Sequence, residues 1–198
     1  MLRAALLVVA IMPANASADS ATPLRTLFSF NDPESSRRWL AVNDTVMGGR
    51  SDGRFRINRY KNLEFFGNLS LANNGGFASV RTRPSSLHLK TGDSIVLKVR
   101  GDGREYSLNL YTPTRRMAFS FRTRFETKTD EWTTVTLPLS SFVATSFGRV
   151  VPNTPLEPER VSRIGIMLGD KKAGPFRLEI DSILVQSSGN TLLSTRQN

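Results

Sequence analysis

The segment from Met117 to Glu126 reads MAFSFRTRFE and decides the fold class. Every second residue from Met117 onward is apolar apart from Thr123, and the residues between them are small, polar or charged. Because successive side chains of a β-strand point to opposite faces of the sheet, this period of two predicts a half-buried strand. We therefore expect the chain to build a β-sheet around this segment.

The same alternation recurs along the chain from residue 24 onward. Clusters of Gly, Asn, Asp and Pro separate the alternating segments, and no segment shows the period of a long amphipathic helix. This spacing predicts an all-β fold, a two-sheet antiparallel β-sandwich of jelly-roll type. We expect strands over residues 24–30, 54–60, 63–71, 77–83, 95–99, 106–111, 117–126, 132–139, 163–168 and 176–180, with short helical turns over 33–38 and 157–161.

A length of 198 residues suits one domain with one core. We expect that domain over residues 24–186, followed by a loose polar tail over 187–198. Arg3, an apolar run over residues 4–12 and small residues over 14–18 predict a secretory signal peptide over residues 1–18. A periplasmic or secreted location follows, with at most a peripheral contact with a membrane. The alternatives for this segment are an amphipathic anchor or a mitochondrial presequence.

The composition excludes several classes of function. The chain has no cysteine and a single histidine, His88, which excludes disulfides, thiol catalysis and Cys/His zinc sites. No set of nucleophile, base and orienting residue stands out, so we expect no enzyme, no cofactor and no metal centre. A calcium site built from Glu179 and Asp181 with Asn31 or Asp32 stays open.

The excess of basic residues points to an acidic partner. Lys and Arg number 27 against 17 Asp and Glu, a formal net charge of +10. We expect no nucleic acid as the partner, because the chain carries no recognised reader motif and the N-terminal segment indicates export. The candidates that remain are an acidic protein and an anionic glycan.

Two groups of residues are candidates for a binding site. Residues 42–53 read VNDTVMGGRSDG, a polar stretch with a double glycine that is either a binding loop or a turn between sheets. Several arginines lie on the polar phases of expected strands, where a planar guanidinium can pair with a carboxylate, sulfate or phosphate. Tyr111 also lies on a polar phase, whereas the other aromatic residues at strand positions are expected in the core.

In order along the chain, the motifs resemble one known family. They include Trp39 with residues 42–51, then FGNLSLANNGGFASVR over residues 66–81, and VRGDGR over residues 99–104. Later come LPL over residues 137–139, Ile164-Gly165, and GPFRLEIDSI over residues 174–183. This order resembles the complex I intermediate-associated protein family (the NADH:ubiquinone oxidoreductase intermediate-associated protein domain).

The resemblance implies a galactose-binding-domain-like jelly roll and a non-catalytic role. We expect an assembly-factor or chaperone-like domain that binds a protein partner, with intermediates of respiratory complex I as a candidate partner. The alternative is a module that binds carbohydrate or an anionic glycan. The expected partner-binding or ligand-binding residues are Asn43, Asp44, Met47, Gly48, Gly49, Ser51, Arg81, Arg100, Asp102, Arg104, Tyr111, Arg122, Arg124 and Asp170.

Overall fold

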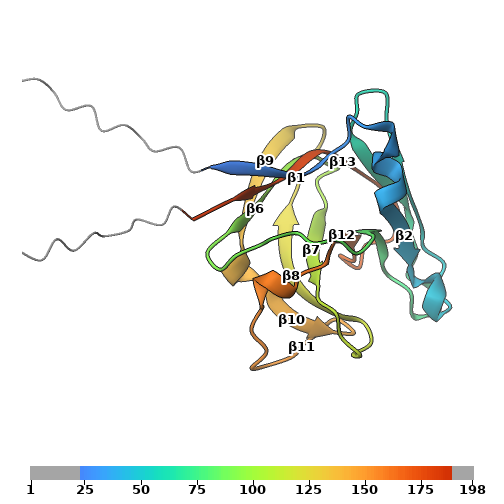
Figure 1. Ribbon diagram of the computed structural model, residues 1–198. Helices are drawn as coiled ribbons and strands as arrows, with labels where there is room; N and C mark the ends of the chain where they lie inside the picture. The colour runs from blue at the N-terminus through green and yellow to red at the C-terminus, as the bar shows by residue number, and fades with distance from the viewer. Residues whose placement is uncertain (1–22, 189–198) are drawn as a thin grey trace, which may run out of the picture.

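Two antiparallel β-sheets face each other across one hydrophobic core (Figure 1). The computed structural model describes residues 23–188, so the expected signal peptide and nearly all of the expected tail lie outside the described residues. Within that range, no helix is long and apolar enough to cross a membrane. The expected jelly-roll sandwich is confirmed.

Sheet A has six strands, and the long last strand lies near its middle. The order is β3-β4-β13-β6-β9, and β1 also pairs with β13. Its strands are β1 (Leu24–Ser29), β3 (Asp52–Ile57), β4 (Leu63–Leu69), β6 (Ser94–Arg100), β9 (Trp132–Pro138) and β13 (Gly174–Gln186).

Sheet B has seven strands in the order β11-β10-β8-β7-β12-β5-β2. Its strands are β2 (Trp39–Asn43), β5 (Ala78–Thr82), β7 (Glu105–Tyr111), β8 (Phe119–Glu126), β10 (Val143–Ser146), β11 (Arg149–Val150) and β12 (Arg163–Leu168). The 3₁₀ turns are η1 (Pro33–Arg38), η2 (Asp44–Met47), η3 (Ala72–Asn74), η4 (Leu139–Ser141) and η5 (Pro158–Arg160).

The alternating pattern decides which side chains enter the core. On β7, Tyr106, Leu108 and Leu110 are buried in the core cluster, whereas Ser107 and Asn109 point to the other side of sheet B. Burying one such leucine contributes about 1.5–3 kcal/mol relative to leaving it in water. The core therefore fixes which residues form the outer face.

The alternation predicts ten of the strands, including β8 in the quoted segment. The turns at Pro33–Arg38 and Pro158–Arg160 also match the expected helical turns. The sequence does not predict β2, β10 or β11, which are edge or near-edge strands of sheet B. β10 and β11 span four residues or fewer, too few for a period of two to emerge, and β2 (WLAVN) is apolar at four of its five positions, so it does not alternate.

Candidate functional site: an arginine cluster on the outer face of sheet B

One row of residues crosses the outer face of sheet B, on the side away from the core. Strand pairing places each member beside the next, across six neighbouring strands. The row alternates with core positions along each strand, so its side chains point outward. It runs through Val143, Arg122, Asn109, Gly165, Arg81 and Leu40.

Tyr111 lies two residues along β7 from this row, and three arginines surround it. Arg163 is its direct partner on β12. Arg81, from β5, places its guanidinium carbon 5.1 Å from the centroid of the Tyr111 ring. Arg122 comes from β8, which flanks β7 on the opposite side. We name these four residues the Tyr111 cluster.

Gly165 opens the passage by which Arg81 reaches Tyr111. It lies on β12, between the strands that carry these two residues. A Cβ atom at this position would lie 3.0 Å from Arg81 Cγ and 3.1 Å from Tyr111 Cε2, closer than ordinary van der Waals contact. The missing side chain therefore lets the arginine cross β12 and lie against the ring.

Arg122 is held in place by neutral partners. Its Nε donates to Asn109 Oδ1 at 3.0 Å, and Ser120 Oγ donates to the same oxygen at 3.1 Å. Burial lowers the pKa of Arg122; Tyr111 opposes this, and the charges of Arg124 and Arg81 lower the pKa further. A guanidinium starts from so high a pKa that it keeps its charge at neutral pH.

The phenol of Tyr111 keeps its proton. Burial raises the pKa of Tyr111, and the positive charges of Arg81, Arg122 and Arg163 oppose that rise without cancelling it. The hydroxyl is therefore neutral at physiological pH and can donate a hydrogen bond. The cluster combines three positive charges with one neutral donor.

The cluster has no negative charge of its own. In residues 23–188, none of Arg81, Arg122 and Arg163 forms an ion pair with a carboxylate. The neighbouring Arg124 does pair, with its Nη1 3.3 Å from Glu105 Oε1. Three cations on one face can receive a carboxylate, phosphate or sulfate through charge-assisted hydrogen bonds.

The loop over residues 43–53 is organised around Asp44, which is 1% exposed. The Asp44 carboxylate accepts hydrogen bonds from Ser51 N at 2.9 Å, Ser51 Oγ at 2.6 Å, Gly76 N at 2.6 Å and Phe77 N at 3.3 Å. Burial alone would raise the pKa of Asp44, but these hydrogen bonds outweigh it and lower the pKa. We name Asp44, Ser51, Gly76 and Phe77 the Asp44 junction.

The packing around Asp44 explains why this loop contains glycines. A Cβ atom on Gly49 would lie 2.3 Å from Asp44 Cγ, so only glycine fits there. Gly48 has a φ of 87°, which glycine adopts without strain. Asn43 Nδ2 donates to Gly53 O at 3.0 Å, across the loop. Five of the predicted binding residues (Asn43, Asp44, Gly48, Gly49 and Ser51) therefore shape the loop, while Met47 is exposed.

The other predicted charges are paired within the fold. Arg104 Nε and Nη2 donate to the two carboxylate oxygens of Asp170 at 3.0 and 2.7 Å, and both side chains are nearly buried. Asp102 accepts from Arg104 N at 3.2 Å. Arg100 donates to Glu179 at 2.9 Å. Among the predicted residues, Arg81 and Arg122 lie on either side of Tyr111, and neither guanidinium forms an ion pair with a carboxylate in the described residues.

The sequence does not reveal the roles of Arg163 and Gly165. Both lie on β12, which chain order places far from Tyr111 and Arg81. Glu179, part of the open calcium hypothesis, instead accepts hydrogen bonds from arginine and asparagine side chains. Within the described residues, no group of three His, Cys, Asp or Glu side chains is arranged to hold a metal ion.

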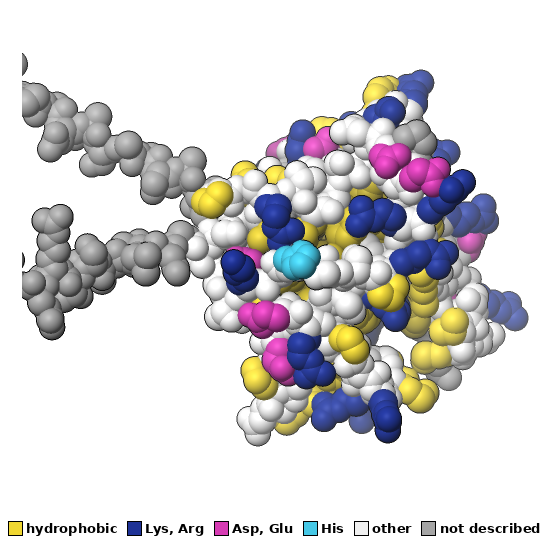
Figure 2. Space-filling model, in the orientation of Figure 1, with side chains coloured by type: hydrophobic (Ala, Val, Ile, Leu, Met, Phe, Trp, Pro, Cys, Tyr) yellow, Lys and Arg dark blue, Asp and Glu magenta, His cyan; other side chains and the backbone are white. Residues whose placement is uncertain are grey.

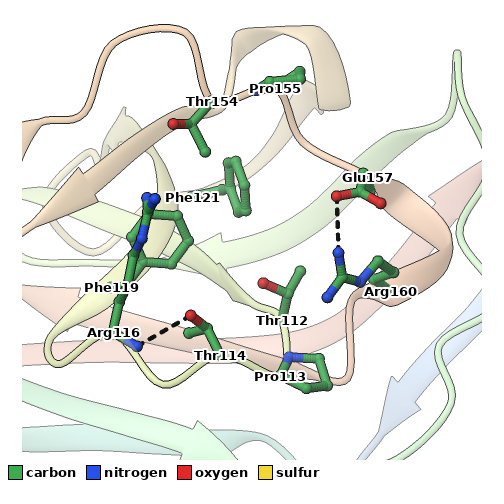
Figure 3. A pocket seen from close by; sticks show the side chains of 10 residues that line it. All are labelled: Thr112, Pro113, Thr114, Arg116, Phe119, Phe121, Thr154, Pro155, Glu157 and Arg160. Atoms are coloured by element: carbon green, nitrogen blue, oxygen red, sulfur yellow. Dashed lines mark hydrogen bonds and ion pairs between the residues drawn. The ribbon is translucent and has the colours of Figure 1, made fainter.

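A cavity of about 240 Å³ lies at one end of sheet B, between the β7–β8 loop and residues 154–160. Phe119 and Phe121 form its apolar part, and Arg116 faces the Glu157–Arg160 ion pair across it (Figure 3). The ion pair spans 3.0 Å, and the one remaining guanidinium of the lining, that of Arg116, lies 5.4 Å from the centroid of the Phe119 ring. The cavity is therefore a weaker candidate than the Tyr111 cluster.

Comparison with known sequences identifies relatives of the whole domain. The model of the family described as Complex I intermediate-associated protein 30 (CIA30) matches residues 28–180. A mouse protein named "Complex I intermediate-associated protein 30, mitochondrial" is 28% identical over 181 residues, which cover 80% of this chain and 55% of the relative. The Drosophila melanogaster protein of the same name is 27% identical over 183 residues, covering 79% and 61%. The chain thus spans just over half the length of these relatives.

Solved structures share the fold. A family 11 carbohydrate-binding module from Clostridium thermocellum, in complex with a β-1,3-1,4-mixed-linked tetrasaccharide, superposes with a TM-score of 0.64 at 14% identity. The match covers 85% of this chain and 98% of the module. An exo-β-agarase matches with a TM-score of 0.54 at 10% identity, covering 83% of this chain and 25% of the agarase. At these identities the likeness shows a common jelly-roll sandwich.

The expected periplasmic or secreted location is wrong. The mouse, Drosophila and Neurospora crassa relatives all carry the word mitochondrial in their names. That expectation rests only on the N-terminal pattern of a basic residue, an apolar run and small residues. The N-terminal segment itself, residues 1–22, lies outside the described residues.

Proposed function

This chain belongs to the complex I intermediate-associated protein 30 family, and on that premise we propose that it is a non-catalytic assembly factor. Its relatives are named for their association with complex I intermediates. The proposed partner is accordingly a protein subunit or intermediate of respiratory complex I. The proposed contact is an acidic segment of that partner, bound by the Tyr111 cluster.

The observation that carries this proposal is the unpaired charge of the cluster. Arg81, Arg122 and Arg163 converge on Tyr111 from three strands, and none of them has a carboxylate partner in the described chain. A partly buried cation is stabilised most by a partner that brings its own negative charge. A glutamate or aspartate side chain supplies that charge in a flat group that matches the guanidinium.

Carbohydrate binding is the second candidate, since the fold is shared with carbohydrate-binding modules. Sugar recognition on a sheet face commonly uses an exposed aromatic ring on which the sugar stacks. Here the Arg81 guanidinium lies 5.1 Å from the Tyr111 ring centroid and covers one face of it. The geometry therefore favours an anionic ligand over a neutral sugar.

A complementation experiment tests the assembly role. Cells in which the gene is deleted are expected to lose assembled complex I, and the wild-type chain is expected to restore it. The Arg81→Gln/Arg122→Gln variant should accumulate to the wild-type level without restoring complex I. A matched control, Arg37→Gln/Arg59→Gln, removes two charges from exposed positions elsewhere and should complement fully. Deletion that leaves complex I content unchanged would exclude the assembly role.

A direct binding experiment tests the ligand class. The probes are a fluorescent glutamate-rich peptide, a lysine-rich peptide, heparin and a neutral β-glucan. We expect the glutamate-rich peptide to bind, and each of Arg81→Gln and Arg122→Gln to weaken it about tenfold, the size of one charge-assisted hydrogen bond. Binding of heparin in preference to the acidic peptide would replace the protein partner with an anionic glycan.

A further inference from the structure

Exposed apolar side chains gather at the end of sheet B where the β10–β11 hairpin lies. Met117 is 74% exposed, Phe147 59% and Val150 64%. They make up three of the nine large hydrophobic side chains that are most exposed among the described residues. Such a concentration marks an interaction surface, whereas single exposed apolar residues do not.

Two loops form this end as one unit. Phe147 N donates to Ala118 O at 3.3 Å, and Ser146 Oγ donates to Met117 O at 3.2 Å. The β7–β8 loop and the β10–β11 turn are thus joined by one backbone hydrogen bond and one hydrogen bond from a side chain to the backbone. We name the exposed residues of these loops the hairpin tip, which consists of Arg115, Arg116, Met117, Phe147, Arg149 and Val150.

Phe147 occupies a backbone position that disfavours it. Ser146 and Arg149 pair directly, so Phe147 and Gly148 form a two-residue turn. Their φ angles are 47° and 76°, and turns of this kind favour Asn and Gly at both positions. A bulky aromatic residue there is costly, and its ring is nevertheless left in solvent. A strained backbone position that carries an exposed aromatic ring indicates that the ring contacts a ligand or partner.

The charge of the hairpin tip has one sign. Residues 112–121 and 143–156 contain no Asp or Glu, and the tip carries Arg115, Arg116 and Arg149. Within residues 23–188, none of these three forms an ion pair with a carboxylate. In Figure 2, basic and hydrophobic side chains lie side by side at the lower end, where Figure 1 labels β10 and β11.

We propose that the hairpin tip docks the domain onto a lipid bilayer that carries anionic headgroups. Protruding apolar side chains can enter the boundary between headgroups and acyl chains, and flanking arginines can bind lipid phosphates. A hydrophobic protein partner fits less well, because the apolar residues protrude on a turn and do not line a groove. The hairpin tip is separate from the Tyr111 cluster, so lipid would be a second class of ligand for this domain.

The test is co-sedimentation of the full chain with two kinds of vesicle. One kind is phosphatidylcholine alone, and the other is an equal mixture of phosphatidylcholine and phosphatidylglycerol. The wild-type chain should sediment with the mixed vesicles and remain in solution with the neutral ones. Raising the salt concentration should weaken the binding to the mixed vesicles, because salt screens the arginine contribution.

The decisive variant is Met117→Ser/Phe147→Asn. It removes two apolar side chains, and Asn suits the positive φ at residue 147, so the variant should fold at least as well as the wild type. We expect its partition onto mixed vesicles to fall at least about tenfold. Arg149→Gln should lower the partition by a smaller factor.

The matched controls lie at the opposite end of sheet B. Val46 is 72% exposed, and Arg50 is also exposed; both follow β2, whose last residue pairs with Ala78. Val46→Ser should leave vesicle binding unchanged, and Arg50→Gln, which lowers the net charge as Arg149→Gln does, should have a smaller effect than Arg149→Gln. Equal binding by wild type and the decisive variant, or equal losses in Arg149→Gln and Arg50→Gln, would overturn the proposal. Absence of binding to mixed vesicles would also overturn it.

Discussion

The Asp44 junction and the Tyr111 cluster are both polar and partly buried, but they differ in how their charges are satisfied. Asp44 receives four hydrogen bonds from its own chain. The three arginines around Tyr111 receive no carboxylate within residues 23–188. A charge that the fold satisfies is part of the architecture, whereas a charge that it leaves unpaired is available to a ligand.

The largest expected effect is the loss of the Asp44 carboxylate. Asp44→Ala should lower the free energy of unfolding by about 3 kcal/mol or more, because Ser51 N and Gly76 N would be buried without an acceptor. Urea unfolding at neutral pH measures it. The matched control is Asp52→Ala, which removes an exposed ion pair with Arg54 and should cost less than about 1 kcal/mol. Equal losses in both variants would contradict a structural role for the Asp44 junction.

The next effect is a pH dependence that Asp44 imposes on stability. Its folded-state pKa lies below the ordinary value of 3.8, so its contribution is complete above 3.8 and is lost as the pH falls through the folded pKa. The difference in free energy of unfolding between wild type and Asp44→Asn should therefore be constant near neutral pH and shrink below 3.8. Glu64 and Asp170, whose pKa values are also lowered, titrate in both proteins and cancel. A difference that does not change with pH would contradict this.

The sequence predicts the strands better than the site because the two depend on different ranges of interaction. A period of two within one segment is enough to predict β8 and to place Arg122 on its outer face. The same reasoning assigns Tyr111 to the polar phase of β7. The period of two does not predict that Arg81 and Arg163 lie beside Tyr111, because their positions depend on β12 lying between β7 and β5. Strand order follows from the packing of the whole core, which no local pattern encodes.

The loop over residues 43–53 illustrates the opposite case. Its density of polar residues and glycines is visible in the sequence, and both a binding loop and a shaped turn are consistent with it. The structure shows why those residue types occur: Gly49 and Gly75 leave room for the Asp44 side chain, and Ser51 caps it. A partner-binding role for the exposed Met47 stays a prediction.

A smaller effect is expected at Gly165, and it tests the passage between β5 and β7. Gly165→Ala should push Arg81 off the Tyr111 ring and weaken the glutamate-rich peptide about threefold, less than the loss of the arginine itself. In the Arg81→Gln background the same substitution should have no further effect on affinity. Fluorescence anisotropy of the four proteins in this cycle measures the coupling. Additive losses would mean that Gly165 acts elsewhere.

The smallest expected effect is that of the Tyr111 cluster on stability, and it contrasts most directly with the effect of the Asp44 junction. Arg81→Gln/Arg122→Gln should change the free energy of unfolding by no more than about 0.5 kcal/mol, because no ion pair is lost. Asn109 Oδ1 would still accept from Ser120 Oγ, and Ser79 Oγ, which loses the hydrogen bond from Arg81 Nε, would still donate to Val42 O. Removing two neighbouring positive charges also relieves repulsion, which offsets the lost packing of the arginine stems. The same urea titration measures this, and a loss as large as that of Asp44→Ala would make the Tyr111 cluster architectural, with no charge left for a ligand.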